Sequence, residues 1–370
     1  MKNNNYISNI DTIYILAYFK NYDKNISIEL LLTMLKIEKE KAKNILIQNR
    51  TYKHIIKIKN MTFELLPNGT RGYSYILKNA GYELHIAEFK SSISNFAPVK
   101  IRISSEYLWA YGLMISYKNI YTFISEIFGV PSNVKVSRVD MAMHIENADF
   151  TSNYQTSYKG NYKKSNANYN NKIINALTFG SRSSPIYCRI YDKSLEIKEQ
   201  SKKIWFYDIW QKHNMNIHNV WNVEFELKSE FLRNYNISNP IELMEHLNSI
   251  WRYLTCEWIV KINKDNTRVD RCTTSKIWNL VQNGYSNYNS KELVKRDIQK
   301  CSDAIATIPT ITGYLTTYAA KRGILDIEVA IQEILNESAK YLLDNKNTFL
   351  NNEIKRKIPL YHESEVIENE

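Results

Sequence analysis

The sequence predicts an α+β fold: a largely antiparallel sheet with helices, followed by a helical C-terminal domain. Short apolar, β-branched and aromatic runs separated by turn residues continue as far as Pro240. Beyond Pro240 the apolar residues change to helical spacing. Hydrophobic residues make up 44% of the 370 residues, which is enough for a substantial core. We therefore expect a mixed domain over 1–238 and a helical region with an acidic tail over 239–370.

The N-terminal elements follow from apolar spacing. Residues 10–19 form an apolar, β-branched and aromatic run typical of a buried strand, and residues 28–48 show the apolar stripe of a helix. Turn sequences separate four further predicted strands, at 54–66, 73–77, 82–89 and 99–104. This order indicates an antiparallel meander, and residues 120–128 are predicted to form a helix that ends at Gly129.

The second half of the chain begins with another strand series, from Lys135. Residues 153–171 are rich in Tyr, Asn, Lys and Ser without an apolar period, so we expect a mobile surface loop there. Its mixture of cations and aromatic rings is also typical of a single-strand-binding surface. Helices are predicted over 241–262, 274–281, 290–305 and 327–343.

Charge and composition narrow the class of protein. Lys and Arg outnumber Asp and Glu by 49 to 38, a formal charge of +11, which favours a polyanionic partner such as nucleic acid. The four cysteines are too dispersed for a zinc pair or a disulfide framework. No run approaches the roughly 20 apolar residues that span a bilayer, and the N-terminus lacks a secretory signal pattern. We therefore expect a cytoplasmic protein without a membrane partner.

Three predicted strands, near 138–145, 185–193 and 221–228, alternate between apolar and polar residues. The residues of the polar faces are Arg138, Asp140, Ala142 and His144; Tyr187, Arg189, Tyr191 and Lys193; and Asn222, Glu224, Glu226 and Lys228. If these strands are neighbours, the three polar faces merge into one wet patch that combines tyrosines, arginines and carboxylates.

Such a patch suits the cleavage of a phosphodiester by transesterification. That reaction requires a hydroxyl nucleophile, a divalent cation at the phosphate, and cationic side chains for the charge of the transition state. A tyrosine phenol can act as the nucleophile when a metal or a base activates it. The carboxylates of Asp140 and Glu224 are hard oxygen ligands that suit Mg²⁺ or Mn²⁺.

Three ordered motifs carry a resemblance to a known family. They are the segments 136–142 (VSRVDMA), 179–184 (FGSRSS) running into 189–193 (RIYDK) and Glu196, and 223–227 (VEFEL). The sequence resembles the replication initiation factor family, which comprises rolling-circle plasmid initiators, related conjugative-element relaxases and filamentous-phage initiators. The resemblance covers roughly residues 10–235, and the segment 267–271 (TRVDR) with Trp278 is similar to the phage branch.

The resemblance implies a DNA nicking and joining endonuclease that starts rolling-circle replication of a mobile element. Tyr191 would attack one strand of the origin, remain bound to the 5′ phosphate and release a 3′-OH that primes synthesis. Asp140 and Glu224 would hold the metal. His144 stands where relatives carry an acidic residue, and it is a third candidate ligand that suits Mn²⁺ better than Mg²⁺. The expected partners are single-stranded or supercoiled origin DNA and a host helicase.

Several assignments stay open at this point. Tyr187 is a rival nucleophile on the same strand face, and Arg189 and Lys193 either bind phosphate or merely flank an exposed strand. Further candidate DNA-binding residues are Arg138, Arg182, Tyr187, Lys163 and Lys164. A DNA-binding protein that recognises an origin or regulates copy number without cutting is the main alternative, and a tyrosine recombinase is another. The type of mobile element, the origin sequence and the oligomeric state, a homodimer being one option, also stay open.

Overall fold

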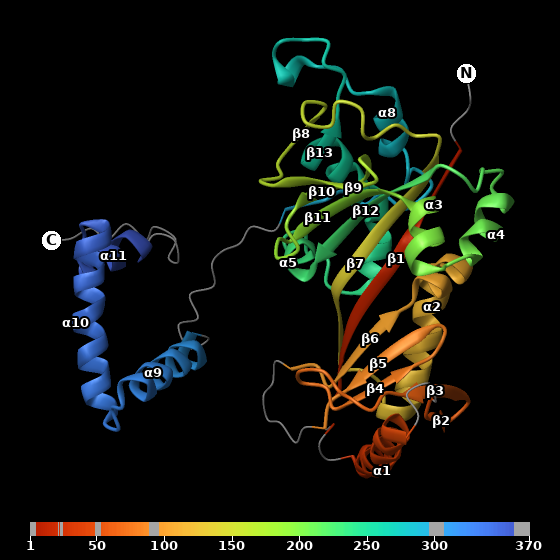
Figure 1. Cartoon of the computed structure of the whole chain (residues 1–370). Helices are drawn as coiled ribbons and strands as arrows, with labels where there is room; N and C mark the ends of the chain where they lie inside the picture. The colour runs from red at the N-terminus through yellow and green to blue at the C-terminus, as the bar shows by residue number, and fades with distance from the viewer. Residues whose placement is uncertain are drawn as a thin grey trace. The chain divides into compact units, whose positions relative to one another are not determined.

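The structure of the protein is a computed structural model, and it confirms the α+β class. It describes residues 5–20, 22, 25–48, 53–88, 96–295 and 307–358. The chain divides into two compact units, Met1–Lys295 and Arg296–Glu370. The first unit contains a large antiparallel sheet with helices, and the second is helical (Figure 1).

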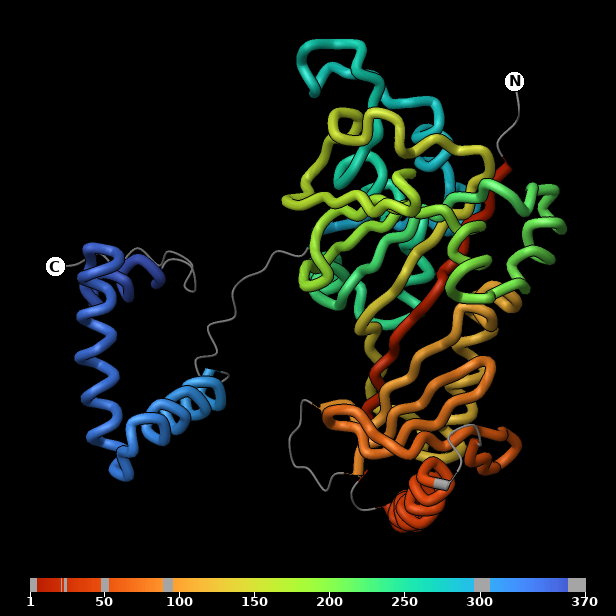
Figure 2. Tube along the Cα trace, viewed as in Figure 1, coloured from red at the N-terminus to blue at the C-terminus, as the bar shows by residue number. Residues whose placement is uncertain are grey.

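The sheet of the first unit contains eleven strands among the described residues, in the order β2-β3-β4-β5-β6-β1-β7-β12-β11-β10-β9. Every pairing between neighbours is antiparallel. The strand β1 runs diagonally across the unit and joins its two halves (Figure 2). The strands are β1 (Tyr6–Tyr18), β2 (Ile55–Ile58), β3 (Met61–Leu65), β4 (Tyr75–Lys78), β5 (Tyr82–Ile86), β6 (Val99–Ile103), β7 (Asn133–Glu146), β9 (Ser165–Asn170), β10 (Ile173–Gly180), β11 (Ile186–Asp192) and β12 (Val220–Lys228).

The N-terminal half follows the predicted order with two differences. The helix α1 (Ile26–Gln48) lies where expected, but the strand predicted over 54–66 is a hairpin, because Lys59 turns the chain at φ 54°. The helix expected over 120–128 is the end of a longer one, α2 (Ser105–Phe128), which is capped by Ser104. Its kink at Gly112, φ 74°, interrupts the helical period and explains why the pattern predicts only the last part.

The loop predicted over 153–171 is wrong in part. Within it, β8 (Tyr158–Gly160) pairs with β13 (Ile259–Lys261), and β9 pairs with β10 at the edge of the large sheet. An edge strand with mostly exposed side chains needs no apolar period, because its backbone hydrogen bonds hold it in place. Most side chains of β9 are exposed accordingly.

The single helix predicted over 241–262 is also wrong. The segment contains α6 (Pro240–Glu245), α7 (Leu247–Tyr253), a π-helical turn (Leu254–Trp258) and β13, because His246 and Ile259 leave helical backbone angles. The helix α8 (Lys276–Gln282) lies within the predicted range 274–281 to a residue or two. Residues 290–295 are not helical, and the rest of the helix expected over 290–305 lies outside the described residues.

The division near residue 238 does not coincide with the division into compact units. The helices α6, α7 and α8 place Leu243, Trp251 and Trp278 in the same core as β7, β11 and β12, so residues 239–295 belong to the first unit. The second unit contains α9 (Ile308–Arg322), α10 (Ile327–Lys346) and α11 (Leu350–Lys357). Among the described helices, none is long and apolar enough to cross a membrane.

Candidate active site

The three alternating strands are direct neighbours, with β12 between β7 and β11. Their register aligns the polar residues in rows across the sheet. The rows are Asp140–Glu226–Tyr187, Ala142–Glu224–Arg189 and His144–Asn222–Tyr191. Residues aligned in this way on one face have Cβ atoms about 5 Å apart. The structure thus brings the predicted nucleophile, carboxylates and cations onto one face.

Tyr191 lies at the centre of a hydrogen-bond network. Its hydroxyl donates to Glu224 Oε2 at 3.0 Å, and Asn222 Nδ2 donates to the same hydroxyl at 2.9 Å. Asn222 also donates to Glu224 at 3.1 Å, which closes a triangle. Burial and the charges of Glu224 and Asp11 raise the pKa of Tyr191 well above its usual value. The phenol is therefore protonated at neutral pH, with its proton directed at Glu224.

Two cations of the second motif flank this phenol. Arg189 forms an ion pair with Glu224 Oε1, so that both carboxylate oxygens of Glu224 are engaged. Asp192 accepts a hydrogen bond from Leu195 N at 2.9 Å, and this cap starts the short helix α3 (Lys193–Glu196) directly after β11. The turn places the buried ammonium group of Lys193 3.4 Å from the Tyr191 hydroxyl.

Asp140 lies in the next row of the same face, beside Arg138. The guanidinium group of Arg138 donates to both oxygens of Asp140, at 2.8 and 2.6 Å, and lies 2.9 Å from Glu226. Burial raises the pKa of Asp140 to about 7, and the charges of Glu224 and Glu226 add to this effect while Arg138 opposes it. The site therefore holds more carboxylate charge than its arginines neutralise.

His144 lies on the same face but beneath a cover of aromatic rings. Its ring stacks on Trp109 at 4.7 Å, and Trp210 Nε1 donates to its Nδ1 at 3.0 Å. Burial and the charges of Lys193 and Lys203 hold the pKa of His144 well below its usual value. Nδ1 therefore accepts a hydrogen bond, while the buried Nε2 has no hydrogen-bond partner among the described residues, and metal binding by His144 stays a prediction.

The expectation of a wet polar face is corrected by the burial of these residues. Asp140, His144, Asn222 and Glu224 are 3% exposed or less. The cover over the His144 end comes from Trp109 of α2 and from Phe206 and Trp210 of α4 (Trp205–Lys212), which form a second apolar cluster with Ala142. Arg189 and Tyr191 stay partly exposed, so access to the phenol is on their side of the face.

The other candidate DNA-binding residues lie at the β10–β11 end of the sheet. Arg182 is exposed in the hairpin turn that begins at Gly180, whose φ of 83° requires glycine, and its guanidinium group lies over the Tyr187 ring at 5.9 Å. Tyr187 itself is 9% exposed and, in the described part of the chain, forms no hydrogen bond to a carboxylate of the site. Lys163 and Lys164 are exposed between β8 and β9.

Two residues of the site had no predicted role, although Asn222 was predicted to lie on the polar face. Asn222 has the right alternation in the sequence, but only the register shows that it contacts the phenol. Asp11 comes from β1, where a bulge between Ile10 and Thr12 breaks the two-residue alternation. It accepts hydrogen bonds from Ser105 and Trp109. Burial raises its pKa, but the charges of Lys203 and Lys193, together with the hydrogen bond from Ser105, leave the pKa below its usual value.

The oxygen atoms of the site can be compared with the ligands that a divalent cation prefers. Within the described residues, no group of three or more His, Cys, Asp and Glu side chains is placed to hold a metal ion. Mg²⁺, however, is commonly bound by one or two protein carboxylates together with substrate phosphates. Asp140 and Glu224 fit that pattern, and the buried Oδ1 of Asn222, which has no hydrogen-bond partner among the described residues, is a third oxygen nearby.

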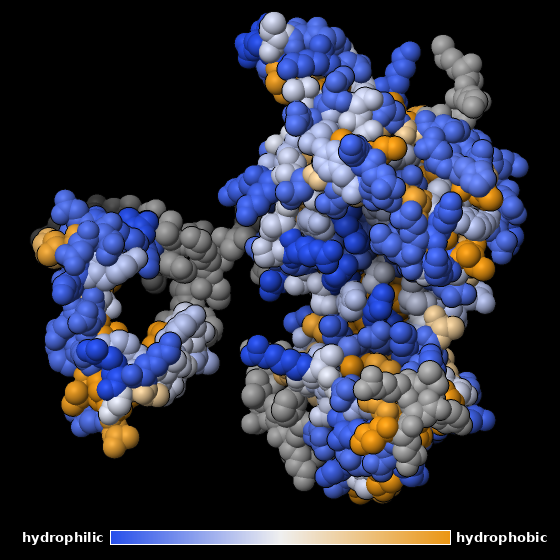
Figure 3. Space-filling view, in the orientation of Figure 1, coloured by the Kyte–Doolittle hydropathy of each residue, from blue (hydrophilic) through white to orange (hydrophobic). Residues whose placement is uncertain are grey.

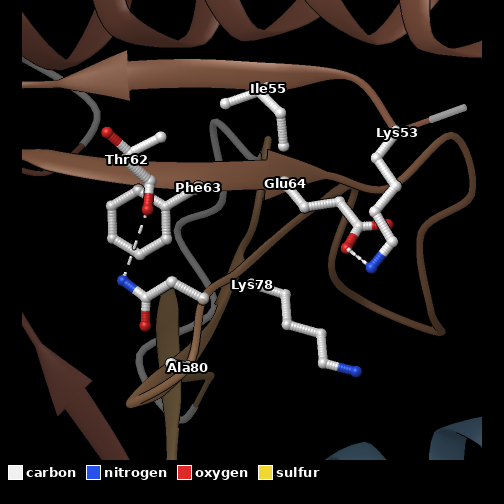
Figure 4. Close-up of a pocket in the computed structure, with 8 residues that line it drawn as sticks. Lys53, Ile55, Thr62, Phe63, Glu64, Lys78 and Ala80 are labelled. Carbon is white, nitrogen blue, oxygen red and sulfur yellow. Dashed lines mark hydrogen bonds and ion pairs between the residues drawn. The ribbon is translucent and has the colours of Figure 1, made fainter.

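A separate cavity of about 380 Å³ lies at the other end of the sheet, on β2, β3 and β4 (Figure 4). It is lined by Ile55, Phe63 and Ala80, and by polar residues that include the ion pair Lys53–Glu64. None of the candidate site residues lines this cavity.

Comparison with known proteins gives one kind of match. No protein-family model matches the chain, and no curated protein matches it. A matching solved structure is that of the rolling circle replication initiator protein from Geobacillus stearothermophilus. The two chains share 13% sequence identity at a TM-score of 0.45, over 79% of this chain and 99% of that chain.

Proposed function

We propose that this protein nicks and rejoins one strand of DNA by transesterification at Tyr191 and so initiates rolling-circle replication of a mobile element. One observation carries the proposal: the Tyr191 hydroxyl donates to Glu224 while Asn222 and Lys193 contact its oxygen. A phenol held between a carboxylate and an ammonium group has a base for its proton and a cation for the charge that develops. The ordered motifs that resemble replication initiators support the same function.

In the proposed reaction, the Tyr191 oxygen attacks the phosphorus of the scissile phosphodiester. The phenol proton moves along the existing hydrogen bond to Glu224, a new phosphorus–oxygen ester forms, and the bond to the 3′ oxygen breaks. The 3′ oxygen takes up a proton and leaves as a free 3′-OH. Attack by this 3′-OH on the phosphotyrosine reverses the step and rejoins the strand.

The other residues of the site have matching tasks in this proposal. Arg189 lies beside the phenol, and its buried Nε has no hydrogen-bond partner among the described residues, which suits an acceptor such as a phosphate oxygen. Asp140 and Glu224 would hold Mg²⁺ or Mn²⁺, which when bound would neutralise the phosphate. The positive charge of such an ion would also offset the burial and the carboxylate repulsion that together raise the pKa of Asp140.

The test is covalent capture of DNA. Purified protein is incubated with a pool of single-stranded oligonucleotides of random sequence and Mn²⁺ or Mg²⁺, and adducts that survive denaturation are sequenced. A label at the 3′ end should travel with the protein, and the released fragment should be extended by a polymerase, because the expected linkage is to a 5′ phosphate.

Matched variants of the two tyrosines on β11 complete the test. Tyr191→Phe should abolish the adduct, whereas Tyr187→Phe should retain it, because only Tyr191 contacts Glu224. Persistence of the adduct in Tyr191→Phe would refute the assignment. DNA binding by the wild type without any adduct would favour the non-cleaving alternative, and a label retained from the 5′ end would indicate a recombinase-type linkage.

A further inference from the structure

Beyond the candidate active site, four cations gather around two tyrosines of β1. The ammonium group of Lys100 lies 5.0 Å from the centre of the Tyr14 ring. The guanidinium groups of Arg102 and Arg138 lie 5.8 and 5.5 Å from the same centre. The ammonium group of Lys135 lies 5.3 Å from the centre of the Tyr18 ring. We call these six residues the β1 cation strip.

Strand register explains why the strip is continuous. Tyr14 pairs with Arg102 on β6 and with Arg138 on β7, so cations flank it on both sides. Leu16, the next residue on this face, pairs with Lys100 and Lys135. The alternate residues of β1, among them Ile15 and Ala17, are buried in the core, so the strip occupies the opposite face.

The strip continues directly into the candidate active site. Arg138 contacts the Tyr14 ring and also holds Asp140 and Glu226, so it belongs to both surfaces. Figure 3 shows strongly hydrophilic residues gathered at mid-height on the visible face of the first unit. The strip is therefore a cationic extension of the site along β1.

Positive charge on the strip is only partly compensated. Arg102 lies 3.4 Å from Glu83, which also contacts His85, and Arg138 is paired with the site carboxylates. Among the described residues, Lys100 and Lys135 form no ion pair within 4.0 Å, although Lys100 interacts favourably with the charge of Glu83 and unfavourably with that of Arg138. Like charges held together by aromatic rings create a positive potential that attracts a polyanion.

We propose that the β1 cation strip binds the phosphate backbone of the single DNA strand that flanks the scissile phosphate, which rests on the proposed function of the site. From Tyr14 to Tyr18 the strand advances by four residues, about 13 Å at roughly 3.3 Å per residue. That length is enough for a short run of phosphates of a single strand. The three strands that carry the strip span about 10 Å, the width of a single backbone.

The arrangement also indicates what is recognised. Since the Tyr14 ring already carries three cations, its role is to hold them in place rather than to stack on a base. Ammonium and guanidinium groups that meet phosphates provide affinity and register but no base readout. The strip therefore binds DNA of any sequence and leaves recognition of the origin to other residues.

The test compares two double variants with equal loss of charge. Lys100→Gln with Lys135→Gln removes the unpaired cations of the strip, and Lys264→Gln with Lys276→Gln removes two exposed lysines near α8. The probe is a fluorescent single strand of about 20 nucleotides of mixed sequence. Its binding is measured by fluorescence anisotropy at several salt concentrations, with a chelator present so that no cleavage occurs. Thermal melting confirms that each variant is folded.

We expect the strip variant to bind about tenfold or more weakly at physiological salt and to lower the slope of log affinity against log salt by about 1.4, or roughly 0.7 per lost phosphate contact. The Lys264 and Lys276 variant should bind like the wild type. An unchanged slope in a folded strip variant would overturn the proposal. Polyglutamate serves as a second probe in the same assay. If the strip variant loses affinity for polyglutamate and not for DNA, the proposal is also overturned, and the strip binds an acidic peptide.

Failure of the proposed function would look different. Absence of a Tyr191 adduct with wild-type affinity for the probe would refute nicking and leave the strip intact. If the wild type forms the adduct but the strip variant binds the probe with an unchanged salt dependence, the role of the strip is refuted and the proposed nicking activity is kept.

Discussion

Asp140 allows a direct test of the buried charge at the site. Its pKa of about 7 results first from burial and then from the charges of Glu224 and Glu226, against the opposing effect of Arg138. In an unfolded chain an aspartate has a pKa near about 3.9. Between about pH 4 and pH 7, the folded protein therefore keeps a proton on Asp140 that the unfolded chain has released.

The sign and size of the effect follow from linkage. A carboxyl group with a raised pKa in the folded state contributes stability that is present below about pH 4 and is lost as the pH rises towards 7. One pKa unit corresponds to about 1.4 kcal/mol. Titration of this one group between about pH 5 and pH 8 thus removes about 3 kcal/mol from the free energy of unfolding, and almost no further loss arises above that range.

The assay is urea denaturation at about pH 5 and about pH 8 with a chelator present. Asp140→Asn has no carboxyl group to titrate, so its free energy of unfolding should fall by about 3 kcal/mol less than that of the wild type over this range. Asp208→Asn removes an exposed carboxylate on α4 and should follow the wild type. Parallel pH curves for the wild type and Asp140→Asn would refute the reasoning.

Metal, phenol and histidine each provide a further test. At about pH 8, Mg²⁺ or Mn²⁺ should raise the melting temperature of the wild type and not that of Asp140→Asn, because only the wild type offers the second carboxylate. Asn222→Ala removes the donor to Tyr191 and Glu224 and should slow single-turnover adduct formation by about 10- to 100-fold. Trp210→Phe deletes the donor to buried His144 and should lower the free energy of unfolding in urea by about 1–3 kcal/mol. Equal shifts of melting temperature in the wild type and Asp140→Asn would contradict the first prediction. A wild-type rate of adduct formation in Asn222→Ala would contradict the second, and an unchanged free energy of unfolding in Trp210→Phe would contradict the third.

The shared face of β7, β11 and β12 was predictable because strands have a fixed period. Alternation of apolar and polar residues assigns each side chain of a strand to a face without reference to its neighbours. The ordered motifs add that these strands belong to one site. The contact between Tyr191 and Glu224 then needs only the register, which places Arg189 opposite Glu224 and Tyr191 opposite Asn222.

Other parts of the site depend on tertiary structure that leaves no periodic signal. The bulge in β1 brings Asp11 to the site and cannot be read from alternation, because it interrupts alternation. Burial of the polar face comes from Phe206 and Trp210 on α4, a helix that follows β11 and folds back over His144. The β1 cation strip can be recognised only once the order of strands in the sheet is known, because β6 and β7 are separated in the chain by α2.

The ion pairs of the site define its state in the absence of DNA. Arg138 is paired with Asp140 and Glu226, and Arg189 with Glu224, so the groups that suit a phosphate are held by the groups that suit a cation. A phosphate that arrives alone must compete with these carboxylates, and a cation that arrives alone must compete with the arginines. If both bind, Asp140 and Glu224 would hold the cation and the two arginines would neutralise the phosphate, so that neither charge would be left unpaired. DNA and metal should therefore each raise the affinity for the other, as reciprocal linkage requires.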